Sequence, residues 1–303
     1  MEKHYKAGTV TLVGRTNVGK SSLLNRAIGE KVAIVSDKPQ TTRNRIAGIL
    51  TNERFQAVIY DTPGIHKPLH RLGEYLVRVA YGALSGVDLV VAVVDASERL
   101  TLQDKRVASL IERSSSPFFL VLNKMDLCRN EERLEELMAD CRLQFPSARG
   151  IYQISAITGK GVDDLLLAIA GFLPEGPPLF PEDIVSDKPL KFMIAEIVRE
   201  KILQTTREEV PHSCGIYLQE LEYRGDGTLY VLADIVVERD SQKPIIIGKG
   251  GRQIKEIGVQ ARRDIEYLSD RKVFLELFVK VRKNWREKDS MIQEYTGLRD
   301  EVS

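Results

Sequence analysis

A glycine-rich stretch near the N-terminus has the spacing of a loop that holds phosphate groups. Residues Gly14–Ser21 match the pattern G-x-x-x-x-G-K-S/T, follow the strand-like run Thr9–Val13 and open a helical segment. In such a loop the backbone N–H groups and the helix dipole face the phosphates, a lysine reaches the β- and γ-phosphates and a serine ligates Mg²⁺. We therefore predict that a nucleotide is bound by Gly14, Arg15, Thr16, Asn17, Val18, Gly19, Lys20 and Ser21.

A second motif indicates which base the nucleotide carries. The residues Asn-Lys-Met-Asp, ending at Asp126, directly follow the apolar run Phe118–Leu122, so they should lie at the carboxyl end of a strand, where α/β sheets bind ligands. The Asp126 carboxylate can accept hydrogen bonds from N1–H and the exocyclic amine of guanine, whereas adenine has no such pair of donors. Two small residues after the run Ile151–Ile154 should complete the base pocket. The predicted base contacts are Asn123, Lys124, Met125, Asp126, Ser155 and Ala156, and the predicted ligands are GTP and GDP.

A third motif, Asp-Thr-Pro-Gly, ends the apolar strand Phe55–Tyr60. A carboxylate at Asp61 can hold Mg²⁺ through water, and the N–H of Gly64 can face the γ-phosphate. The predicted nucleotide contacts here are Asp61, Thr62, Pro63, Gly64 and Ile65.

The order of these motifs resembles that of the translation-factor-like GTPases. The resemblance implies that Gln40–Arg43 is the first switch, in which a threonine, Thr42 in preference to Thr41, ligates Mg²⁺ with Ser21 and Asp61. The catalytic residues that it implies are Lys20, Thr42, Asp61, Gly64 and Asn17. Ile65 stands where many regulatory GTPases have a glutamine that orients water, so slow hydrolysis is expected. The resemblance also makes K⁺, held by Asn17, a candidate cofactor beside Mg²⁺.

A second glycine loop lies in the last third of the chain. Gly248–Gly251 fits G-x-x-G, follows Ile245–Ile247 and precedes a predicted amphipathic helix with Ile254, Ile257, Ala261, Ile265 and Leu268 on one face. Such a loop grips the backbone of single-stranded RNA in KH domains. From Lys243 to Lys288 there are 13 Lys and Arg against 6 Asp and Glu, an excess of seven positive charges. We predict RNA contacts at Ile247, Gly248, Lys249, Gly250, Gly251, Arg252 and Lys255.

The alternation of apolar runs and helical patterns predicts two domains in the 303 residues. The expected fold is α/β: a P-loop GTPase domain (1–175), with a mostly parallel sheet and helices on both faces, followed by a smaller α+β domain of KH type (191–290). The proline-rich segment 176–190 is the expected linker, and 291–303 an irregular acidic tail. A hairpin should make one edge strand, Ile46–Leu50, antiparallel.

Composition excludes several classes of protein. The content of 43% hydrophobic and 29% charged residues is that of a soluble globular protein. No apolar run is long enough to span a membrane, and the N-terminus does not resemble a signal segment. The three cysteines form no CxxC pair, so reduced thiols and a cytoplasmic location are expected.

Taken together, the GTPase motifs and the C-terminal KH pattern resemble the Era family of GTPases over nearly the whole chain. The resemblance implies a monomer that binds the 3′ region of small-subunit rRNA when loaded with GTP. It also implies a role in 30S subunit maturation and peripheral association with the inner face of the cell membrane. A GTP-regulated RNA-modification factor is one alternative, but the sequence has no further catalytic constellation for it. A constitutive RNA-binding protein with a relic P-loop is another, although Lys20, Ser21 and Asp126 are all present.

Overall fold

A computed structural model describes residues 5–68, 70–114 and 116–297 of the chain. Their contacts divide the chain into two compact units. The first unit takes in the chain up to Ala33 together with Arg45–Lys67 and Tyr75–Asp187. The second takes in Ile34–Asn44, Pro68–Glu74 and the chain from Lys188 onward. The C-terminal domain therefore includes two short segments that the sequence assigns to the GTPase half.

The first unit is built on a six-stranded sheet whose strand order is β2-β3-β1-β4-β5-β6. Only β2 runs antiparallel to its neighbour β3, which confirms the predicted hairpin edge. Five of the six strands are mostly apolar and buried, as expected of a parallel sheet covered on both faces, whereas the short edge strand β6 is half-buried to exposed. Their bounds are β1 Lys6–Val13, β2 Ile46–Thr51, β3 Phe55–Asp61, β4 Leu89–Asp95, β5 Phe118–Asn123 and β6 Ile151–Gln153.

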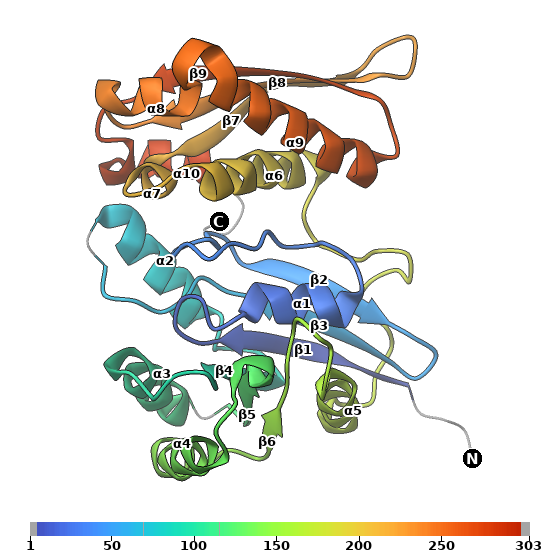
Figure 1. The fold of residues 1–303 in the computed structure, drawn as a ribbon. Coiled ribbons are helices and arrows are strands. Elements are labelled where there is room, and N and C mark those ends of the chain that lie inside the picture. Colours follow the sequence, from blue (N-terminus) through green and yellow to red (C-terminus); the bar gives the residue numbers. More distant parts are fainter. Residues whose placement is uncertain (1–4, 69, 115, 298–303) are drawn as a thin grey trace. The chain divides into compact units, whose positions relative to one another are not determined.

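Helices cover this sheet in two groups. Residues of α3 and α4 share one hydrophobic core with β4 and β5, while α1 and α5 contact each other and the β2–β3 side of the sheet. Figure 1 shows the sheet between these groups. The helices are α1 Lys20–Ile28, α2 Arg71–Gly82, α3 Leu102–Arg113, α4 Glu131–Gln144 and α5 Val162–Phe172. This arrangement confirms the predicted α/β fold and brings the carboxyl ends of the strands to one edge.

The second unit has a three-stranded sheet, β7-β8-β9, in which β7 and β8 are antiparallel and β8 and β9 parallel. In Figure 1 the long helices α6 and α9 lie together against this sheet, and the apolar side chains of all three layers form one core. The elements are α6 Leu190–Thr205, α7 Val210–Ser213, β7 Gly215–Tyr223, β8 Leu229–Val237, α8 Lys243–Ile247, α9 Arg252–Ser269, β9 Val273–Val281 and α10 Asp289–Thr296. The predicted α+β domain of KH type is thereby confirmed.

Two segments differ from what the sequence suggests locally. The expectation of an irregular tail is wrong for Asp289–Thr296, which forms α10 and buries Ile292. The proline-rich segment is also anchored, because the backbone N–H groups of Leu179 and Phe180 both donate to the side chain of Gln56. Both differences arise from contacts with residues that are distant in the sequence. The exact domain boundaries stay a prediction.

Candidate functional site

The loop Gly14–Ser21 folds around its own lysine. Lys20 begins α1, is 6% exposed, and its Nζ donates to the carbonyl oxygens of Arg15 at 2.9 Å and Gly14 at 3.3 Å. Burial lowers the pKa of Lys20 to about 8; nearby Asp61 opposes this shift and Arg15 adds to it. A buried ammonium group held only partly by carbonyls gains most from an anionic partner, so the loop fits a bound phosphate.

Close packing joins this loop to the Asp-Thr-Pro-Gly segment after β3. The N–H of Ile65 donates to the carbonyl of Gly14 at 3.1 Å. A Cβ on Gly64 would lie only 2.7 Å from the Cα of Thr16, and a Cβ on Gly14 would lie 2.5 Å from the carbonyl oxygen of Val93. Glycine is therefore required at these two positions because the backbones approach too closely for a side chain.

Ser21 and Asp61 meet beside the loop. The Ser21 hydroxyl donates to Asp61 Oδ2 at 2.5 Å, and Asp61 is fully buried. A hydroxyl and a carboxylate are hard oxygen donors, which suit Mg²⁺. Thr62 is also buried and donates to the carbonyl of Leu12, which fixes the start of the segment, and Pro63 is buried next to it. The Ile65 side chain is 5% exposed and packs into the core shared by β4 and α3.

Asn123 ties together the phosphate loop and the predicted base loop. Its side-chain amide donates to the carbonyl of Val18 at 2.8 Å, and its Oδ1 accepts the N–H of Ala156 at 2.9 Å. The next residue, Lys124, has φ of 67° and its Nζ lies 2.5 Å from Asp95 Oδ2. Asp126 follows in a short 3₁₀ turn with an exposed side chain, as a carboxylate that receives a base must have.

The remaining residues of the predicted base loop and phosphate loop are held mainly by backbone geometry. The N–H of Met125 donates to the carbonyl of Ile154 at 3.1 Å, and Ser155 is 1% exposed and donates its N–H to the carbonyl of Lys160. Asn17 is exposed, with φ of 64°, and Gly19 has φ of 94°. The structure thus brings the predicted residues of all these motifs, except those of the first switch, to the carboxyl edge of one sheet.

Sequence reasoning missed two supporting residues, Arg26 and Asp95. Arg26 on α1 donates to the carbonyls of Ala156 and Ile157 and so supports the base loop. For Asp95, burial alone would raise the pKa, but the hydrogen bonds from Lys124 and Ser97 prevail and lower it. Asp95 could have been suspected as a charged residue that ends an apolar strand, whereas nothing in the sequence singles out Arg26.

The side chain of Arg15 is held mainly by carboxylates outside its own loop, and its one hydrogen bond within the loop is a long one, from Nη1 to the Thr16 carbonyl at 3.5 Å. Its Nε lies 3.2 Å from Asp104 and its Nη2 lies 2.5 Å from Glu98. Any contribution of Arg15 to nucleotide binding in this conformation therefore comes from its backbone.

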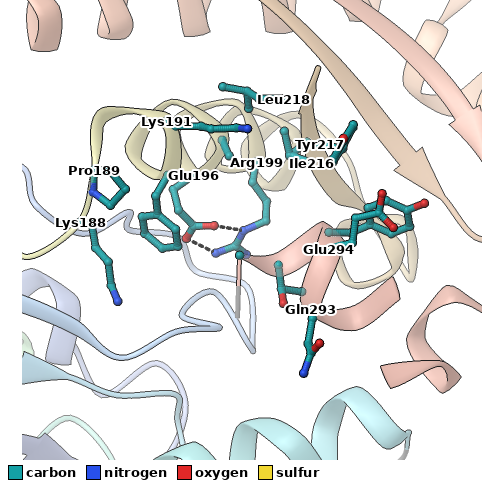
Figure 2. Close-up of a pocket in the computed structure, with 15 residues that line it drawn as sticks. Lys188, Pro189, Lys191, Glu196, Arg199, Ile216, Tyr217, Leu218, Gln293 and Glu294 are labelled. Atoms are coloured by element: carbon teal, nitrogen blue, oxygen red, sulfur yellow. Dashed lines mark hydrogen bonds and ion pairs between the residues drawn. The ribbon is translucent and has the colours of Figure 1, made fainter. Parts of the chain in front are cut away.

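The segment predicted to be the first switch, Gln40–Arg43, belongs to the second unit. Thr41 and Thr42 are each 8% exposed, and the carbonyl of Thr41 accepts a hydrogen bond from Arg199 of α6. Arg199 also pairs with Glu196 at the wall of a cavity in this unit (Figure 2). Sequence reasoning gave no indication that the C-terminal domain contacts this segment.

The second glycine loop sits at the start of the 18-residue helix α9. Gly248, Gly250 and Gly251 have φ of 71°, 61° and 76°, a region that favours glycine. A Cβ on Gly250 or Gly251 would have no neighbour within 4 Å, so the loop presents its backbone openly. The N-terminus of a long helix adds N–H groups and a positive potential that suit a phosphate backbone.

Exposed basic side chains surround this loop. Lys249, Arg252 and Lys255 are all exposed, and none of them takes part in an ion pair within the described part of the chain. Ile247 is half-buried against the core of the second unit. Three exposed cations around an open glycine loop are an arrangement that can bind RNA phosphates.

No helix in the described ranges is both long and apolar enough to cross a membrane. Comparison with known families matches residues 9–124 to a family described as 50S ribosome-binding GTPase and residues 209–286 to the KH domain. The first match includes the phosphate loop and the Asp-Thr-Pro-Gly segment, and the second includes the loop Gly248–Gly251.

Individual relatives match the whole chain. GTPase Era of Thermotoga petrophila is 49% identical and covers 98% of this chain and 99% of its own length. GTPase Era of Geotalea uraniireducens is 46% identical, with 97% and 98% covered. One similar solved structure is Era in complex with MgGDPNP and nucleotides 1506–1542 of 16S ribosomal RNA. Its TM-score is 0.93 and its sequence identity 38%, and the match covers 96% of this chain and 99% of the Era chain. Another is a point variant of Aquifex aeolicus Era bound to GDP·AlF₄⁻, with TM-score 0.91, 39% identity and 96% and 98% covered. On this identity over nearly its full length, the chain belongs to the family of the GTPase Era.

Proposed function

We propose that this GTPase binds GTP and Mg²⁺ in the first unit, hydrolyses GTP slowly, and binds single-stranded rRNA through the Gly248–Gly251 loop. The observation that carries the nucleotide half is the bridge made by Asn123 between the Val18 carbonyl and the Ala156 N–H. This bridge supports the proposal that Asp126 and the loop Gly14–Ser21 serve one nucleotide. The Era structures with MgGDPNP and with GDP·AlF₄⁻ support the choice of ligands.

The residues around the phosphates have separate roles. Lys20 neutralises the β- and γ-phosphates, and the N–H of Gly64 donates to the γ-phosphate as negative charge moves during cleavage. When bound, Mg²⁺ would offset the negative charge of the phosphates. It would be held by Ser21 and Asp61, with Thr42 as the switch ligand. These assignments rest on the contacts above and on the family motifs.

Hydrolysis should be slow because Ile65 lies in the apolar core and has no polar group to orient the attacking water. Asn17 is the residue proposed to hold K⁺ against the phosphates, where a cation would act as an arginine finger does.

The RNA half of the proposal rests on the open glycine loop and its exposed cations. We infer that the ligand is the 3′ region of small-subunit rRNA and that the protein acts in 30S subunit assembly. The solved complex of a relative with nucleotides 1506–1542 of 16S rRNA supports this choice of RNA. In this proposal the glycine loop holds the RNA backbone.

Guanine selectivity tests the nucleotide half. Asp126→Asn replaces an acceptor by an amide, so GTP affinity should fall by about tenfold or more while xanthine nucleotides bind better. Competition binding with GTP, XTP and ATP measures this. Equal affinity of the unmodified protein for ATP and GTP would contradict the assignment.

RNA binding in the two nucleotide states tests the switch. Full-length protein with a non-hydrolysable GTP analogue should bind an oligonucleotide of the 16S rRNA 3′ end more tightly than protein with GDP. A scrambled oligonucleotide of equal length is the control. Equal affinity in both nucleotide states would argue against a switch, and equal affinity for both RNAs against sequence recognition.

We further infer a monomer in the cytoplasm that associates peripherally with the inner face of the cell membrane, on the basis of the family resemblance. Flotation of the GTP- and GDP-loaded protein with vesicles of bacterial lipid tests the association. Light scattering tests the oligomeric state.

A further inference from the structure

Helix α1 lies between the proposed phosphate site and the segment Ser155–Ile157, which supplies two of the predicted base contacts. The helix begins at Lys20, and Arg26 lies in its last turn. The rise along a helix between these two positions is about 9 Å. One helix therefore carries a lysine for the phosphates at its start and an arginine near its end.

Arg26 holds the segment Ser155–Ile157 by two successive carbonyls. Its Nε donates to the carbonyl of Ala156 at 3.1 Å, and its Nη2 donates to the carbonyl of Ile157. The loop also packs along the guanidinium, because a Cβ built on Gly159 would lie 3.8 Å from the central carbon of that group. A planar guanidinium presents its N–H groups as a rigid fork, so it can fix two acceptors at once.

Within the described part of the chain, two side chains from other elements form hydrogen bonds with Ser155–Ile157. Asn123 is 2% exposed and accepts the N–H of Ala156, whereas Arg26 is exposed and binds the carbonyl side. The other hydrogen bonds of the segment run to neighbours in the same loop. Asn123 thus holds the segment from the interior, and Arg26 holds it from the surface.

The bond from Arg26 to Ala156 also orients the next backbone donor. No cis peptide bond occurs in the described residues, so the Ala156–Ile157 peptide is trans, and its carbonyl and N–H point in opposite directions. The N–H of Ile157 therefore points away from the guanidinium, and it has no acceptor in the described ranges. Guanine has an acceptor in its 6-oxo group, whereas adenine has a donor at the same position. A free N–H held in one orientation suits guanine and not adenine.

We infer that Arg26 is a positioning residue for guanine. It fixes the Ala156–Ile157 peptide so that the N–H of Ile157 can donate to the 6-oxo group, and it thereby prolongs the binding of GDP and GTP. This inference rests on the proposed base site around Asp126. Arg26 binds carbonyls of the base segment rather than groups of the phosphate loop. Its loss should therefore raise the dissociation rate of the nucleotide and leave the rate of GTP cleavage unchanged.

Three variants of the full-length protein test this role. Arg26→Gln removes the charged fork at similar helix propensity, and Arg26→Lys keeps the charge but offers a single ammonium group. Arg142→Gln is the matched control, because Arg142 is also an exposed arginine in the last turn of a helix of the first unit.

Arg26→Gln should raise the Kd of GDP and its dissociation rate about fivefold, and Arg26→Lys less, because exposed hydrogen bonds to carbonyls are of modest strength. Displacement of GDP labelled on its ribose measures both constants. The Kd of 2-aminopurine riboside diphosphate, which lacks the 6-oxo group, should change less than about twofold. The kcat at saturating GTP and the thermal unfolding midpoint should match those of Arg142→Gln.

Unchanged GDP dissociation in Arg26→Gln would overturn the positioning role. An equal loss for the 2-aminopurine nucleotide would overturn it as well, and so would a fall in kcat or thermal stability beyond that of the control, since these results indicate a purely structural role. If the unmodified protein does not prefer GDP to ADP, or Asp126→Asn leaves that preference intact, the proposed base site fails and the role of Arg26 with it. If both of those results support the base site but Arg26→Gln has no effect, only the role of Arg26 is lost.

Discussion

The two glycine loops of this chain, each proposed to bind phosphates, are built differently. Around Gly14 and Gly64 backbone atoms lie so close that a Cβ would collide with them, and Lys20 is buried within the loop. Around Gly250 and Gly251 there is open space, and the neighbouring cations are exposed. A site that must place one γ-phosphate for chemistry needs a rigid, closely packed cradle, whereas a clamp for an RNA backbone needs accessible N–H groups and charge.

The sharpest test of this contrast replaces one glycine in each loop by alanine. Gly14→Ala should destabilise the protein by about 1–3 kcal/mol through overpacking against Val93 and reduce GTP affinity at least about tenfold. Gly251→Ala meets no neighbour and should cost only about 1 kcal/mol for its positive φ, with GTP affinity unchanged. Thermal unfolding and nucleotide titration measure both. Equal losses in the two variants would remove the distinction between a packed and an open loop.

A carboxylate in the open loop should have the next largest effect. Gly250→Asp places negative charge where an RNA phosphate approaches, so RNA affinity should fall about tenfold to a hundredfold while GTP affinity holds. Gly225→Asp, in the exposed hairpin turn of the same unit, is the matched control because a Cβ there also meets open space. Fluorescence anisotropy with a labelled RNA measures the effect. Unchanged RNA binding in Gly250→Asp would place the RNA site elsewhere.

A change of monovalent cation should affect the two loops differently. If Asn17 holds K⁺ against the phosphates, hydrolysis should be about tenfold faster in K⁺ than in Na⁺, and Asn17→Gly, which also accepts φ of 64°, should abolish the difference. RNA affinity at equal ionic strength should be the same in both salts, because phosphate contacts there depend on total salt. Equal turnover in K⁺ and Na⁺ would refute the potassium role without affecting the magnesium assignment.

The smallest predicted effect concerns His212, beside the segment that carries the first switch. Burial lowers the pKa of His212, and Arg43, Arg286 and Lys38 lower it further, whereas its hydrogen bond with the backbone of Pro39 opposes the shift. A histidine with a depressed pKa in the folded state is less protonated there than in the unfolded chain. Above the ordinary pKa of 6.5 His212 is neutral in both states and does not make the free energy of unfolding depend on pH. As the pH falls below 6.5, protonation favours the unfolded chain, so the free energy of unfolding decreases. His212→Gln should reduce the slope of the free energy of unfolding against pH by an amount equivalent to less than one bound proton. An unchanged slope below pH 6.5 would exclude His212 as its cause.

Local signals in the sequence determined much of the first unit and the character of both loops. The strands of the first sheet are continuous apolar runs, and the motif residues follow them directly, so their meeting at the carboxyl edge was predictable. Gly248–Gly251 was recognisable because it fits G-x-x-G between an apolar segment and an amphipathic helix, in a region with an excess of positive charge.

Only the tertiary structure decided which domain holds the first switch. Arg43 and Arg199 look like ordinary charged residues in the sequence, and most of their partners are backbone carbonyls such as those of Cys214 and Thr41. Every residue has a carbonyl, so such a partner leaves no signature in the sequence, and the contacts join residues more than 150 positions apart. The same reason applies to Arg26, which binds the carbonyls of the base loop, and to α10, whose burial of Ile292 depends on neighbours brought together by the fold. Burying a guanidinium is favourable only when such partners already surround it, and that condition is set by the packing of the whole domain.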